Sequence, residues 1–271
     1  MARPAAPRAQ ILTGTGSLCT PGRFTPSYHP ESSFHPFVEF GNRTMSGVLT
    51  VIAVLVLLLV WNARGRARSV RRLGAVPLAG VLAQAVVGGV VVLLELDPRW
   101  VSLHFAVSAA LVWLSAYLLH RWAECDDAPV PVGGSALTVT GWATAALLVP
   151  VIVLGVLVTG SGPHSGDDEV GYRFALDPLA VTRAHSASVW LFVLAVTALV
   201  VLLLRTTPSP RVSAARRAAA VLVVVTLLQG AIGYTQYATG LPALLVGIHM
   251  LGAGLLIWAT AHAVLRLRTR A

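Results

Sequence analysis

Histidine and glutamine recur at equal spacing in two apolar parts of the chain. Gln84 precedes His104 by 20 residues, and Gln229 precedes His249 by the same 20. Small residues follow each glutamine, and each histidine opens a further apolar segment. An internal repeat of this kind determines the architecture of a fold. Imidazole is a common ligand of heme iron, so the duplicated histidines favour heme binding.

A second pairing lies upstream of the first. His185 precedes His249 by 64 residues, and Asn42 precedes His104 by 62. His185 and His249 fall on the second and fourth helices of one half of the chain, which suits a bis-histidine heme between them. An ionisable group in a membrane needs a partner, because burying it alone costs several kcal/mol. Separate hydrogen bonds to neighbouring helices are the alternative, and the repeat favours ligation by the pair.

Two glutamines and two arginines are expected near the level of these histidines in the helices. Gln84 and Gln229 could contact a heme edge or link helices by hydrogen bonds, and the second interpretation is favoured. Arg43 and Arg183 could pair with heme propionates, since arginine binds carboxylates bidentately. The alternative for both arginines is that they extend to the membrane interface.

Glu39 precedes Asn42 by three residues, so a helix would place both on one face. Its carboxylate could transfer protons during oxidation of a bound substrate. Alternatively, it could simply interact favourably with the positive end of a helix dipole.

The composition indicates a membrane protein. Hydrophobic residues make up 56% of the 271 residues and charged residues 11%, whereas soluble domains average about 25% charged. The net charge of +9 comes from arginines clustered between apolar runs. That is the positive-inside pattern and not a nucleic-acid-binding face. Cys19 and Cys125 form neither a disulfide framework nor a metal motif.

Seven apolar runs are long enough to cross a membrane, which needs roughly 20 residues each. The Arg-rich loops and the C-terminus are expected in the cytoplasm, which places the candidate heme residues toward the extracytoplasmic side of the cell membrane. The predicted spans are 46–62, 74–95, 101–120, 136–159, 184–204, 218–238 and 242–265.

The predicted organisation is an all-α bundle of two pseudo-symmetric four-helix halves. An extracytoplasmic segment covers residues 1–45, the N-terminal half 46–122 and the C-terminal half 123–271. The span at 136–159 has no counterpart in the first half. We therefore expect a further helix before the region of Glu39, giving eight in all.

Several motifs together resemble the heme A synthases from about residue 35 onward. They are EFGNR at 39–43, LHF with His104, TGSGPHSGD at 159–167, RAHS with His185 and GIHMLGA with His249. The resemblance implies an eight-helix membrane oxidoreductase that converts the C8 methyl of heme O to the formyl group of heme A for cytochrome c oxidase.

The resemblance also implies roles for individual residues. His185 and His249 would ligate a heme b cofactor, His104 would serve the N-terminal substrate site, and Glu39 would be the functional acidic residue. Asn42 departs from the family, which commonly has histidine at this position. The N-terminal substrate site is therefore expected to offer heme iron a single histidine ligand, His104. The family often carries a cysteine pair in an outer loop, whereas Cys19 has no partner on its side of the membrane.

The predicted function is therefore heme A synthase. The expected partners are heme O, an electron donor such as quinol, and the lipid bilayer. Heme O synthase is expected to deliver the heme O. A homo-oligomer is compatible with the sequence. One alternative is a b-type cytochrome that passes electrons from quinol. Another is a membrane transporter or assembly factor without catalytic activity. Glu39 and the GPHSGD loop favour the synthase, because a simple electron carrier needs neither.

Overall fold

The computed structural model describes residues 35–165 and 171–270, with side chains from residue 40 onward. This part of the chain has seven helices long and apolar enough to cross a membrane, which confirms the predicted polytopic all-α class. They are α2 (His35–Trp61), α4 (Val76–Leu93), α5 (Pro98–Trp122), α6 (Ser135–Ser161), α7 (Pro178–Arg205), α8 (Pro210–Ala238) and α9 (Ala243–Leu265). The short elements are α3 (Arg68–Leu73), β1 (Val130–Pro131) and β2 (Arg268–Thr269).

Three helices begin well before the predicted spans: α2 at His35 and not 46, α7 at Pro178 and not 184, and α8 at Pro210 and not 218. The Asp177 side chain accepts from the backbone N–H of Leu179 at the start of α7, and Ser209 accepts from Val212 at the start of α8. Arg211, Arg216 and Arg217, which precede the predicted span 218–238, therefore lie in the first turns of α8. Hydropathy marks only the segment suited to hydrocarbon, whereas capping residues determine where a helix begins.

The chain divides into two compact units, Met1–Leu55 and Val56–Ala271. Most of α2 belongs to the first. Within α2 the hydroxyls of Thr44, Ser46 and Thr50 each donate to the carbonyl four residues earlier. These bonds satisfy the hydroxyls inside the helix.

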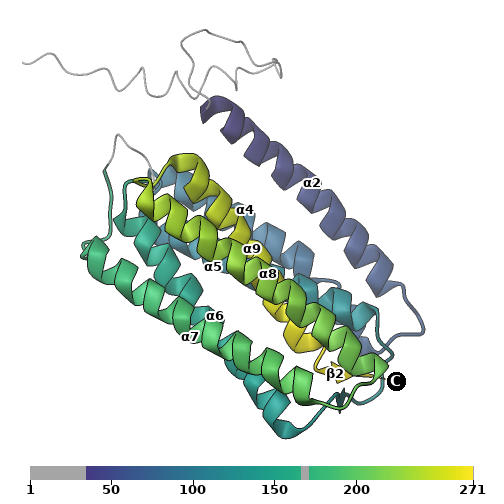
Figure 1. Cartoon of the computed structure of the whole chain (residues 1–271). Coiled ribbons are helices and arrows are strands. Elements are labelled where there is room, and N and C mark those ends of the chain that lie inside the picture. Colours follow the sequence, from purple (N-terminus) through teal and green to yellow (C-terminus); the bar gives the residue numbers. More distant parts are fainter. Residues whose placement is uncertain (1–34, 166–170, 271) are drawn as a thin grey trace, which may run out of the picture. The chain divides into compact units, whose positions relative to one another are not determined.

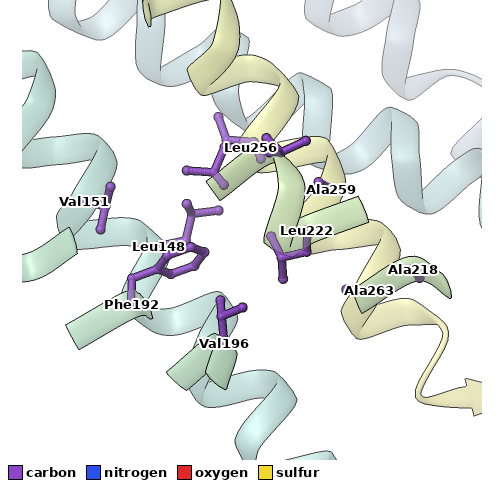
Figure 2. Close-up of a cluster of buried hydrophobic side chains, with 11 residues drawn as sticks. Leu148, Val151, Phe192, Val196, Ala218, Leu222, Leu256, Ala259 and Ala263 are labelled. Carbon is purple, nitrogen blue, oxygen red and sulfur yellow. The ribbon is translucent and has the colours of Figure 1, made fainter. Parts of the chain in front are cut away.

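The second unit is built from helix hairpins. α4 packs against α5, α6 against α7, and α8 against α9, while α5 and α6 also contact α9 (Figure 1). Leu148 and Val151 of α6 meet Phe192 of α7, Leu222 of α8 and Leu256 of α9 in the main core cluster (Figure 2). Helices α6 to α9 thus share one packed interior, as in a four-helix bundle.

An ion-pair network joins segments at the end of the second unit that contains the Arg-rich loops and the C-terminal residues, called here the Arg-rich end. The buried Arg121 pairs with Glu124 at 3.2 Å and with Asp126 at 3.1 Å, and Arg66 pairs with Asp126 at 3.2 Å. Hydrogen bonds from the Arg66 guanidinium and from the backbone N–H of Ala67 lower the pKa of Asp126 to about 2. The loop after α2 is thereby fastened to the end of α5.

The C-terminal tail is tied to the same end. β2 pairs with β1 in antiparallel register, and the backbone N–H of Val132 donates to the carbonyl of Leu267 at 2.8 Å. Arg270 lies 3.7 Å from Glu124 and donates to the carbonyl of Asp127. His120, near the end of α5, is buried and lies 3.1 Å from Glu124.

Candidate functional site

Three histidines occupy equivalent positions in three helices. His104 is the seventh residue of α5, His185 the eighth of α7 and His249 the seventh of α9. α5 and α7 both start with an Asp–Pro pair, whose aspartate (Asp97 or Asp177) caps the helix. At about 1.5 Å per residue, each histidine lies roughly 10 Å from the start of its helix. The helix starts therefore determine a common depth.

Each of these imidazoles rests against a glycine of the preceding transmembrane helix. A Cβ atom built on that glycine would lie 3.2 Å from the histidine Cε1 in every case. Such a distance is tighter than ordinary van der Waals contact, so a larger residue would displace the ring. The pairs are Gly88–His104, Gly155–His185 and Gly233–His249.

The imidazoles turn Nδ1 toward the protein. In all three histidines the Nδ1 atom is buried and has no hydrogen-bond partner, whereas the residue as a whole is only half-buried. At His185 the backbone carbonyl of Val151, one turn before Gly155, interacts with the ring. No hydrogen bond engages Nε2 of these residues within the described chain. Nε2 is therefore the ring nitrogen left to bind a ligand.

His185 and His249 lie on helix faces that turn into the bundle. Phe192 and Leu256, each seven residues further on, are 1% and 6% exposed and belong to the main core cluster (Figure 2). Residues seven apart share a helix face. His185 and His249 therefore lie on the faces of α7 and α9 that contribute to this core.

The glutamines of the repeat make the same contact twice. Gln84 Nε2 donates to the carbonyl of His104 at 3.0 Å, and Gln229 Nε2 donates to that of His249 at 3.1 Å. Gln84 also donates to Ser108. Both bonds connect adjacent helices beside a histidine, which is the helix-linking arrangement expected from the sequence. Any contact of these glutamines with a heme edge stays a prediction.

The other predicted site residues are not gathered around these imidazoles by any described contact. The Glu39 side chain lies outside the described residues, and Asn42 and Arg43 lie on α2 in the first unit. Arg183 is exposed on α7, two residues before His185. Cys125 is an exposed free thiol, and Cys19 lies outside the described residues.

The donor set suits a metal carried by a macrocycle. Within the described ranges, no group of three or more His, Cys, Asp or Glu side chains could hold a bare metal ion. A heme iron needs only one or two axial ligands from the protein, because the porphyrin supplies the rest. The paired imidazoles, each with a glycine clearance, therefore fit heme and not a mononuclear metal site.

Sequence reasoning missed two features near this end of the molecule. One is the role of Gly155, which lies 30 residues before His185 and so does not follow the 16-residue spacing of Gly88–His104 and Gly233–His249. The other is a pocket of about 560 Å³ between the α4–α5 turn and the segment before α7, lined in part by Asp97, Arg99 and Arg173. Nearby, His164 Nε2 lies 2.8 Å from the carbonyl of Leu241, joining two loops.

These features define a polytopic helical membrane protein in which a histidine recurs at equivalent positions of three helices. The family described as cytochrome oxidase assembly protein (COX15-CtaA) matches residues 25–164, about half of the chain. The chain belongs to this family, which confirms the family predicted from its motifs.

Among curated proteins, two similar relatives are both named heme A synthase. One is from Staphylococcus saprophyticus, 24% identical over 163 residues, covering 55% of this chain and 52% of the relative. The other is from Staphylococcus epidermidis, 22% identical over 160 residues, with the same coverage. The chain thus spans about half the length of the curated relatives it matches. No solved structure matches the chain.

Proposed function

We propose that this protein is a heme A synthase, which oxidises the C8 methyl of heme O to the formyl group of heme A. Membership of the family and the names of the relatives support the reaction. The observation that carries the proposal is the pair His185 and His249, each placed against a glycine and both on helix faces that contribute to one core.

In this proposal His185 and His249 hold a heme b through Nε2. Bound there, heme b would supply a one-electron redox centre. The protein holds each imidazole in a fixed position: Gly155 and Gly233 leave room for the rings, and Gln229 links α8 to α9 at His249. The buried residues Phe192 and Leu256 exclude water from the core below.

His104 would hold the substrate heme O in the N-terminal half. Its geometry against Gly88 repeats that of the other two histidines. Asn42 replaces the histidine common in the family and is a poor ligand for heme iron, so His104 would act alone. Glu39 would accept or donate a proton near the substrate. Arg43 and Arg183 are candidates to bind propionates.

The proposed setting is the cell membrane, with the heme sites toward the extracytoplasmic side and the Arg-rich end in the cytoplasm. Converting a methyl to a formyl group removes four electrons, so we propose dioxygen as the oxidant. Each of two hydroxylations would consume one dioxygen, two protons and two electrons from quinol or another donor and release one water, and the resulting diol would lose water to give the formyl group. Heme O synthase would deliver the substrate. Neither the electron donor nor heme O synthase has a described contact in the structure, so both follow from the proposed reaction.

Purified protein with single substitutions tests the cofactor assignment. We expect a low-spin bis-histidine spectrum that His185→Ala or His249→Ala abolishes. His104→Ala should keep that spectrum and stop heme A formation when heme O is supplied. His262→Gln, at the opposite end of α9, serves as the control and should keep the spectrum.

The same experiment separates the alternatives. A b-type electron carrier would show the spectrum and make no heme A in the presence of heme O. A transporter or assembly factor would be purified without colour. Unchanged heme content in both His185→Ala and His249→Ala would refute the cofactor assignment.

A further inference from the structure

A second, smaller pocket lies at the Arg-rich end between α8 and α9. Its volume is about 180 Å³, and it is lined by Ala214, Arg217, Ala218, Val221, His262 and Arg266. Two guanidinium groups and one imidazole thus meet small apolar side chains, with no acidic residue in the lining. The charge of the pocket suits an anion.

Some arginines near this pocket have internal partners, whereas the two that line it have none among the described residues. Arg216, next to Arg217, donates to the carbonyls of Leu203 and Thr206 at the end of α7. Arg270 contacts Glu124 and Asp127. Within the described residues, Arg217 and Arg266 form no ion pair and no side-chain hydrogen bond. Their side chains are exposed and available to a ligand from outside the protein.

The third polar group is held in place. The His262 ring stacks on Trp258, with ring centroids 5.4 Å apart and planes inclined by 5°. Stacking of this kind limits the rotation of the imidazole and fixes the direction of its nitrogens. The pocket therefore combines one oriented imidazole with two exposed cations.

Apolar side chains continue from the pocket into the membrane-spanning part of both helices. On α8, Val221, Val224 and Leu228 follow Arg217 at helical spacing and are 40%, 55% and 56% exposed. On α9, Leu255 precedes His262 by seven residues and is 49% exposed. Each helix thus presents a cationic group at its end and an apolar face beyond it. A lipid has the matching arrangement of a charged head and apolar chains.

We infer that this pocket binds the phosphate of an acidic phospholipid, with the acyl chains along the exposed apolar faces of α8 and α9. Basic pockets between membrane helices are a recognised way to hold anionic headgroups. The inference does not depend on the proposed function, because the pocket lies at the opposite helix ends from His185 and His249.

Lipid binding to the purified full chain tests the inference. The probes are phosphatidylglycerol, cardiolipin, phosphatidylcholine and inorganic phosphate, and the readouts are native mass spectrometry and the thermal shift in detergent. We expect the two acidic lipids to bind and stabilise the protein more than phosphatidylcholine does. Removing both charges in R217Q/R266Q should weaken the binding of the acidic lipids about 30-fold.

A matched control variant tests whether the loss of lipid binding is specific to this pocket. R205Q/R211Q removes two exposed arginines at the same end that do not line it, and it should bind acidic lipid like the wild type. Unfolding without added lipid verifies that both variants are folded. An equal loss in the two variants, equal binding of phosphatidylcholine, or full stabilisation by inorganic phosphate would each overturn the inference.

Discussion

At the scale of single residues, the contact between glycine and imidazole is the most informative feature. It occurs three times with the same closest distance of 3.2 Å, from an ideal glycine Cβ to the histidine Cε1. A glycine inside a helix costs about 1 kcal/mol relative to alanine. Three glycines at this position are therefore explained by the space that they leave for the rings.

Substitution at Gly233 should reveal this role. Gly233→Ala places a methyl group against His249 and should shift the ring, lowering heme content or altering the spectrum. Gly230→Ala is the matched control, because a Cβ there meets nothing within 4 Å. Heme content and thermal unfolding of the heme-free protein are measured for both. If Gly233→Ala retained the normal spectrum, the clearance would be unnecessary.

Much of this site could be predicted from the sequence. The spacing of 20 residues between Gln84 and His104, repeated at Gln229 and His249, indicated equivalent positions, and the structure gives both glutamines the same hydrogen bond. The contact of Gly155 with His185 could not be found in this way. The loop between α6 and α7 is longer, so the spacing of that pair differs from the other two.

At the scale of the helix, the capping residues Asp97 and Asp177 determine where His104 and His185 lie in α5 and α7. Asp177 begins α7 six residues before the apolar stretch that marks the span, because its carboxylate accepts from the N–H of Leu179 at 3.0 Å. Hydropathy alone placed the start at residue 184, which would put His185 at the end of the helix and not two turns inside it. The position of His185 in its helix thus depends on a polar contact outside the apolar run.

Removing this cap should destabilise the start of α7. Asp177→Ala is expected to cost about 0.5–2 kcal/mol of helix or protein stability. Asp177→Asn should retain most of the stability, since asparagine caps helices equally well. Thermal unfolding and hydrogen exchange at the start of α7 measure the effect. Equal stability of the alanine and asparagine variants would show that the cap contributes nothing.

At the scale of the whole molecule, charged contacts at the Arg-rich end join parts of the chain that are distant in sequence. Asp126 accepts from Arg66 and Ala67, near the start of the second unit, and pairs with Arg121 of α5. Hydropathy and charge counting located these arginines at one end of the molecule. They could not identify the partners, because pairing depends on side-chain directions that only the packed helices define.

The low pKa of Asp126 predicts an acid-dependent loss of stability. Its folded pKa of about 2 lies below the ordinary value of about 3.9. The carboxylate therefore contributes its full stabilisation above about pH 4, and this contribution is lost as the pH falls toward 2. Thermal unfolding from pH 6 to 2 measures the change.

Asp126→Asn should remove this contribution at every pH, so the difference in stability between wild type and variant should shrink as the pH falls. Asp127→Asn is the control, because Asp127 contacts Arg270 through its backbone carbonyl. A difference that stayed constant from pH 6 to 2 would contradict the assignment.

The common depth of His104, His185 and His249 in their helices has an energetic consequence. Moving one elementary charge across a membrane potential of 100 mV changes its energy by about 2.3 kcal/mol. In the proposed function, an electron exchanged between irons held by these imidazoles would move little along the helix axes and would therefore cross little of that potential. Such a transfer would be almost electrically silent, and its rate would depend little on how strongly the cell is energised.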